Sequence, residues 1–60
     1  MKVPIWKLIY KDLNETTQMA YIKATRVDLD DTYYVKFFDG ANLVAAYDKG
    51  FVLSVHRSNK

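Results

Sequence analysis

The chain has no cysteine, a single histidine, a single proline and two glycines among its 60 residues. Without cysteine it can form neither a disulfide nor a thiolate metal site, and a reducing cytoplasm is its natural setting. One histidine cannot supply a zinc site unless carboxylates or a second chain provide the remaining ligands. We therefore expect no bound metal and no cofactor.

Long hydrophobic runs are also missing. A membrane-spanning helix needs about 18 or more consecutive apolar residues, and no segment of the chain comes near that length. The opening segment MKVPIWKLIY is interrupted by Lys7 and lacks the small-residue cleavage site of a secretory signal. We expect a cytoplasmic protein without a membrane partner.

The sequence shows no set of catalytic residues. His56 stands beside Arg57, and no serine or cysteine nucleophile pattern accompanies it, so no triad can be assembled. The aspartates at 28, 30 and 31 lack the glycine and the distal glutamate of a calcium-binding loop. Capping the first turn of a helix is the role we expect for them. We predict no catalytic residue and no enzymatic activity.

The charge pattern argues against nucleic acid as a partner. The nine basic residues are spread from Lys2 to Lys60 and exceed the acidic ones by only two. Nucleic-acid-binding domains concentrate their basic residues on one face, and the aspartates near position 30 would repel a phosphate backbone. A small nucleic-acid-binding or transcription-modulating module remains the alternative function, because of the basic excess and the aromatic content.

What the chain does contain is enough apolar material for one small folded domain over residues 1–60. Half of its residues are hydrophobic and 15% are aromatic, which excludes a disordered tail. A strand is predicted over 3–10, with Trp6, Leu8 and Tyr10 on its core face. For 17–27 the β-forming residues favour a second strand in a hairpin with the first, over a helix for which Asp12 and Glu15 have capping-box spacing. Residues 51–57 predict a last strand.

The segment between these strands has two competing interpretations. Asp39-Gly40 between apolar runs is typical of a two-residue hairpin turn, but pairing Phe38 with Ala41 would mix core and solvent residues on each face. Ala41–Tyr47 followed by Gly50 is typical of a helix that ends in a glycine cap. A third interpretation combines them: residues 33–38 form a strand, and Asp39 is the N-cap of a short helix. We favour a helix over about residues 32–48, and at least 41–48. The predicted fold is α+β: a small antiparallel sheet of three to four strands packed by a single helix.

Such a helix would be apolar all round, so it would bury one face on the sheet and leave the other for a partner. The predicted partner-binding residues are Tyr34, Phe37 and Phe38 as aromatic anchors, flanked by Asp39 and Asn42. A monomer, which we favour, keeps this face free. A homodimer that buries it against its own copy is the alternative.

Three stretches of the chain are similar to the small phage antitoxins of the Dmd type, which are about as long as this chain. They are Lys7-Leu8-Ile9-Tyr10 in the opening strand, the turn Asn14-Glu15-Thr16, and Leu43-Val44-Ala45-Ala46-Tyr47 ahead of a last strand that ends at Arg57. Gly40 and the aromatic run 33–38 depart from the long, polar-faced helix of that family.

The resemblance implies a phage-encoded protein without chemistry of its own. Antitoxins of this type bind bacterial endoribonuclease toxins of the RnlA and LsoA type, occupy the active-site groove and block access of RNA. The implied partner is therefore a bacterial endoribonuclease toxin, and the implied location is the cytoplasm of the bacterial host.

Overall fold

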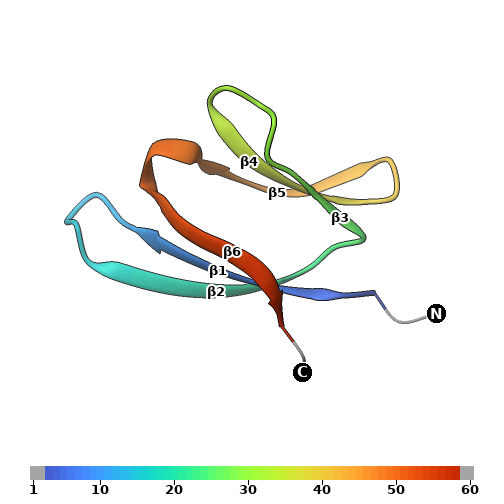
Figure 1. Cartoon of the computed structure of the whole chain (residues 1–60), viewed down its shortest axis with the longest axis horizontal. Helices are drawn as coiled ribbons and strands as arrows, with labels where there is room; N and C mark the ends of the chain where they lie inside the picture. The colour runs from blue at the N-terminus through green and yellow to red at the C-terminus, as the bar shows by residue number, and fades with distance from the viewer. Residues whose placement is uncertain (1–2, 59–60) are drawn as a thin grey trace.

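A computed structural model describes residues 3–58, which form six β-strands and one turn of 3-10 helix (Figure 1). The elements are β1 (Ile5–Lys11), β2 (Thr17–Lys23), β3 (Arg26–Asp28), β4 (Tyr34–Asp39), β5 (Asn42–Asp48), the 3-10 helix η1 (Lys49–Phe51) and β6 (Val52–Ser58). They make two antiparallel three-stranded sheets, sheet A in the order β2-β1-β6 and sheet B in the order β3-β4-β5. The described chain is therefore all-β, and the α+β prediction is wrong.

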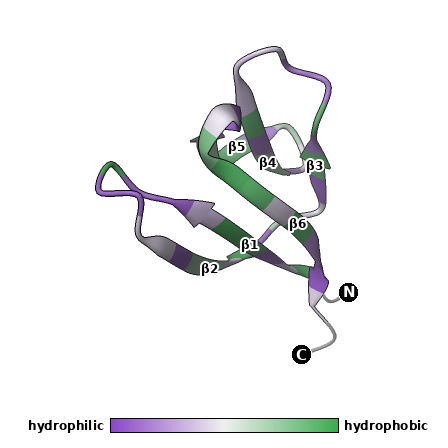
Figure 2. Cartoon of the chain, turned by 60° about the vertical axis from the view of Figure 1, so that its left-hand side comes forward, coloured by the Kyte–Doolittle hydropathy of each residue, from purple (hydrophilic) through white to green (hydrophobic). Residues whose placement is uncertain are grey.

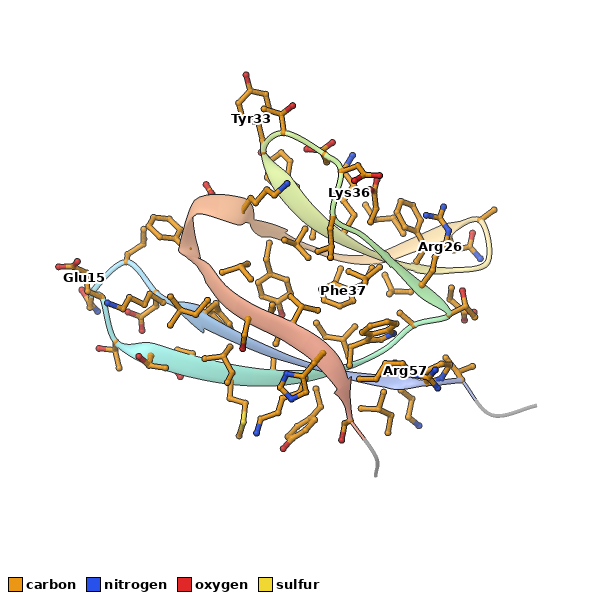
Figure 3. The ribbon with its side chains drawn as sticks, viewed as in Figure 1. Glu15, Arg26, Tyr33, Lys36, Phe37 and Arg57 are labelled. Carbon is orange, nitrogen blue, oxygen red and sulfur yellow. The ribbon has the colours of Figure 1, made fainter. Side chains whose placement is uncertain are left out.

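The two sheets share one hydrophobic core. Its fully buried members are Leu8 of β1, Ala24 just after β2, and Val35 and Phe37 of β4. Figure 3 shows Phe37 pointing into the space between the sheets. Partly buried side chains surround this centre: Trp6, Tyr10, Ile22, Val27, Ala45, Tyr47, Val52 and Val55. The predicted core face of the first strand is confirmed.

The chain crosses from sheet A to sheet B at Ala24 and Thr25. The N–H of Ala24 donates to the carbonyl of Pro4 at 3.1 Å, and its carbonyl accepts from the indole Nε1 of Trp6 at 2.9 Å. The N–H of Thr25 donates to the carbonyl of Phe38 at 2.7 Å. In proteins with two packed sheets, a strand often bends at a corner and continues from one sheet into the other. The strand predicted over 17–27 is therefore two strands with a bend between them.

The predicted helix over 32–48 is replaced by the β4–β5 hairpin. Asp39 pairs with Asn42, and Gly40 and Ala41 make the turn, with Gly40 at φ 61°. Glycine with positive φ at the first turn position is what a type II′ hairpin turn requires. The turn signal thus prevails over the helix propensity of the residues after it. No helix among residues 3–58 is long and apolar enough to cross a lipid bilayer.

A β-bulge explains how this hairpin separates core from surface. Phe38 pairs with Leu43 but Phe37 pairs with Ala45, so Val44 is an extra residue of β5. The shift turns Ala45 towards the core and leaves Val44 exposed. The objection to a hairpin assumed that Phe38 pairs with Ala41, so that each face mixes apolar and polar residues. The turn instead lies one residue later, at Gly40 and Ala41, so Phe38 pairs with Leu43, and the bulge then turns Ala45 and Tyr47 towards the core.

The last strand contains a second irregularity. Its pairing with β1 shifts between Ile9 and Tyr10, because Leu53 is an extra residue. Val52 and Val55 pack against the core, while Leu53 stays about half exposed. A strand was predicted over 51–57, and β6 spans Val52–Ser58.

Candidate binding site

A pocket of about 280 Å³ lies where the β1–β2 turn meets the end of β5 and η1. Its lining combines aromatic, apolar and charged side chains: Tyr10, Lys11, Asp12, Leu13, Ala46, Tyr47, Asp48 and Phe51. Pockets for drug-sized ligands begin at roughly 300 Å³. This pocket therefore has the size for one large side chain of a partner.

Aromatic rings connect the pocket to the core. The ring centroids of Tyr10 and Tyr47 are 5.1 Å apart with their planes tilted by 48°, and Tyr47 also meets Phe37 edge to face at 6.3 Å. Two further apolar side chains of the lining remain in solvent: Leu13 is 90% exposed and Phe51 is 44% exposed. Contiguous exposed apolar patches are common at interaction sites, which makes this pocket the candidate binding surface of the described chain.

Two carboxylates flank these rings. Asp12 accepts hydrogen bonds from the backbone N–H groups of Asn14 and Thr16, at 2.9 and 3.0 Å, and from the side-chain amide of Gln18 at 3.0 Å. The bond from Thr16 contributes most to lowering the pKa of Asp12, followed by that from Gln18, so the group stays ionised at neutral pH. Asp48 supplies the second carboxylate. Aromatic faces between carboxylates suit a cationic side chain such as lysine or arginine.

The β1–β2 turn carries a further carboxylate at a strained position. Glu15 has φ 61°, and no other non-glycine residue within 3–58 has a positive φ. This backbone region costs an ordinary L-residue roughly 1 kcal/mol. Strained residues of this kind concentrate at functional sites. Figure 3 shows Glu15 at the tip of the turn, pointing into solvent.

The β3–β4 loop lies on the other side of η1 and is attached to it by Lys49. The ammonium group of Lys49 donates to the carbonyls of Leu29 and Asp31, at 2.6 and 3.0 Å, and its backbone N–H donates to the carbonyl of Tyr33 at 2.8 Å. Tyr33 is 72% exposed and points away from the body of the protein (Figure 3). The loop therefore extends the surface around the pocket with another exposed ring.

Asp31 caps this loop instead of a helix. Its Oδ1 accepts from the N–H groups of Tyr33 and Tyr34 at 2.8 and 2.9 Å, and its Oδ2 lies 2.9 Å from the Nζ of Lys36. The hydrogen bond from Lys36, followed by those from the backbone, lowers the pKa of Asp31 to about 2. The predicted capping bonds exist, but the helix that they were expected to begin does not.

The five residues predicted to bind a partner are not gathered into one site. Phe37 is fully buried, so a partner cannot reach it in the folded protein. Phe38 lies on the outward face of sheet B, where the guanidinium carbon of Arg26 is 4.2 Å from its ring centroid. Tyr34 is about half exposed near the opposite end of β4, while Asp39 and Asn42 pair beside the hairpin turn. None of the five lines the pocket.

The pocket itself was missed because topology assembles it. Its residues come from the β1–β2 turn and from the β5–η1 segment, which are distant in sequence and meet only in the fold. One signal was present in the sequence. Leu13 is a large apolar residue at the centre of the polar stretch Lys11–Glu15, where it has no core to join.

The described residues place no metal-binding cluster at the pocket. Within residues 3–58, no group of three or more histidine, aspartate or glutamate side chains is placed to hold a metal ion. His56 lies in β6 opposite Lys7, in sheet A, and does not line the pocket. No protein family, curated protein or solved structure matches the chain. Functional inference therefore depends on the pocket, the charge distribution and the resemblance noted in the sequence.

Proposed function

We propose that the protein is a non-catalytic binding module whose pocket end docks on a basic surface of another protein, a bacterial endoribonuclease toxin. The observation that supports this most is the aromatic pocket between Asp12 and Asp48, with Leu13 and Phe51 exposed at its edge. A basic side chain of the partner enters the pocket, and the two exposed apolar residues pack against the surface around it.

The charges around the pocket favour a basic partner. We call the end of the molecule with the β1–β2 turn, the β3–β4 loop and η1 the acidic end, because it carries Asp12, Glu15, Asp30, Asp31 and Asp48. Figure 2 shows that the β1–β2 turn is hydrophilic except for a hydrophobic segment at its tip, and that part of the β3–β4 loop is hydrophilic. Lys36 and Lys49 in this region are already bonded, to Asp31 and to loop carbonyls respectively, and Lys11 is the one cationic residue of the pocket lining, beside Asp12 and Asp48. Charge complementarity of this kind guides association and fixes orientation.

An endoribonuclease is a suitable partner on physical grounds. Such an enzyme binds RNA phosphates through lysine and arginine, so its substrate groove is basic. A protein that occupies this groove needs carboxylates and apolar anchors and no catalytic residues. A standard interface covers roughly 800 Å² on each partner, which is about one sixth of the 4541 Å² surface of this chain. The sequence resemblance indicates the same class of partner, and the inhibitor would act as a monomer in the bacterial cytoplasm.

The test is an inhibition assay with a purified toxin of the RnlA or LsoA type that cleaves a labelled RNA. Wild-type protein should stop cleavage near equimolar ratio. Leu13→Lys should weaken inhibition at least tenfold, because it places a positive charge against a basic groove. Leu43→Lys is the matched control, since Leu43 is also an exposed leucine, at 56%, but lies beside the β4–β5 turn.

Two results would contradict the proposal. Unchanged RNA cleavage in the presence of a large excess of wild-type protein would remove the toxin as partner. Loss of inhibition with Leu43→Lys but not with Leu13→Lys would move the binding surface to the β4–β5 hairpin, beside the predicted residues Phe38, Asp39 and Asn42.

A further inference from the structure

The acidic residues of the chain are absent from one of its two sheets. All seven lie outside β1, β2 and β6, whereas these strands carry Lys7, Lys11, Lys23 and Arg57. The basic residues are spread along the sequence, and this spread was the reason for expecting no nucleic acid. In the fold, however, β1, β2 and β6 form one sheet, so basic residues that are far apart in the sequence lie close together in space.

Strand alternation places the three lysines on one surface. Trp6, Leu8 and Tyr10 of β1 face the core, so the residues between and beyond them face outward. The pairing of β1 with β2 and β6 extends this outward face across the sheet. Lys7 of β1 lies between Tyr21 of β2 and His56 of β6. The neighbouring rows are Met19, Ile9 and Ser54 on one side, with Thr17 and Lys11 beyond them, and Lys23, Ile5 and Ser58 on the other. The outward face of sheet A thus combines three ammonium groups, a phenol ring, an imidazole ring and apolar side chains, with no carboxylate.

We propose that the outward face of sheet A binds single-stranded nucleic acid. The ammonium groups of Lys7, Lys11 and Lys23 contact phosphates, while the rings of Tyr21 and His56 stack on bases. Proteins that bind single strands combine these two kinds of contact. Lys7 lies between the two rings, and neighbouring strands are about 4.8 Å apart. The two strands that carry the rings are therefore roughly 10 Å apart, with the strand that carries Lys7 between them.

The geometry favours a single strand over a duplex. Rings on a flat sheet stack only on bases whose faces are accessible, and those of a duplex are covered by their neighbours. Tyr21 and Met19 are each about half exposed. Apart from Lys11, the face shares no residue with the pocket lining, and the inference does not depend on the toxin as partner.

The binding measurement is fluorescence anisotropy with fluorescein-labelled ten-nucleotide oligothymidylate and oligouridylate. Each phosphate neutralised on a single strand contributes about −0.7 to the slope of log affinity against log salt, so three lysines give a slope of about −2. Raising the salt from about 50 to 200 mM should therefore weaken binding roughly twentyfold. No binding by about 100 µM protein at the lower salt, which is the weak end of non-specific affinities, would overturn the proposal.

Variants locate the site. Lys7→Gln should weaken binding several-fold and reduce the salt slope by about 0.7, and Tyr21→Ser should weaken it roughly tenfold through lost stacking. Lys36→Gln is the matched control, because it removes the same charge from the outward face of sheet B, and its affinity should stay within about twofold of the wild type. Equal losses from Lys7→Gln and Lys36→Gln would show an effect of net charge alone and would overturn the proposed surface.

Two further measurements keep the inference testable if a variant is unstable. Amide chemical shifts of the wild-type protein with the oligonucleotide should change most at Lys7, Tyr21 and His56, and changes confined to the pocket would overturn the assignment. Anionic phosphatidylserine vesicles provide the competing ligand class. Binding to vesicles without binding to either oligonucleotide would assign the face to a lipid surface instead.

Discussion

Phe37 and Phe38 are neighbours in β4 that face opposite sides of sheet B, and replacing each with leucine should have unequal effects on stability. Phe37 is fully buried. Leucine has three fewer carbon atoms, and at about 0.8 kcal/mol for each buried methylene the loss is roughly 2 kcal/mol. A domain of this size is stable by roughly 3–9 kcal/mol, so Phe37→Leu should still fold, with its Tm lowered by about 8–16 °C.

The outward neighbour should matter less. Phe38 is partly exposed and its ring contacts the guanidinium of Arg26. An exposed contact of this kind contributes about 0.5–1 kcal/mol, so Phe38→Leu should cost less than about 1 kcal/mol. Urea unfolding can be followed by the emission of Trp6, the one tryptophan, whose indole donates to the carbonyl of Ala24. The strand assignment would be refuted if Phe38→Leu lowered the free energy of unfolding as much as Phe37→Leu does.

Three other substitutions probe local features. Glu15→Gly should raise the free energy of unfolding by roughly 1 kcal/mol by relieving the positive φ, and thermal melting checks this; a lower Tm would contradict the strain. Trp6→Phe should cost about 1–3 kcal/mol, because the buried carbonyl of Ala24 loses its donor, and urea titration followed by far-UV circular dichroism measures the loss, since this variant has no tryptophan. Asp31 has a lower pKa in the folded state than its ordinary 3.8, so its stabilising effect is complete above about pH 4 and is lost as pH falls towards 2. Asp31→Asn should flatten the pH dependence of Tm over that range, whereas an unchanged slope would show that the bond to Lys36 contributes nothing.

The alternation of apolar and polar residues was sufficient to predict the first strand and its core face. It was not sufficient to predict the strands in the second half of the chain. In β1 the alternation of Trp6, Leu8 and Tyr10 with polar or smaller neighbours survives intact, because the bulge in its pairing with β6 inserts its extra residue in β6 and none in β1. In β5 and β6 an extra residue, Val44 or Leu53, breaks the alternation and shifts the inward positions. A bulge is stabilised by pairing with another strand, so a single-strand pattern contains little trace of it.

The surfaces were harder to predict than the strands. The pocket requires Leu13 and Phe51 to meet, which depends on β6 returning to pair with β1. The placement of Lys7, Lys11 and Lys23 on one face of sheet A likewise depends on which strands pair with each other. Phe37 was taken for a surface anchor because the helical interpretation placed it beside Phe38, whereas the strand turns these two rings to opposite faces. The pocket and the placement of the lysines follow from topology, which periodicity along the chain does not encode, whereas the error at Phe37 follows from choosing a helix over a strand.

The central claim is that the pocket end binds the partner, and the most direct measurement maps that contact on the protein itself. Isotope-labelled wild-type protein would be titrated with an inactive variant of an endoribonuclease toxin while its amide resonances are recorded. The largest changes should fall on Leu13, Asp48 and Phe51, with smaller ones in the β3–β4 loop. Changes confined to the β4–β5 hairpin or to the outward face of sheet A, or no change at all, would contradict the claim.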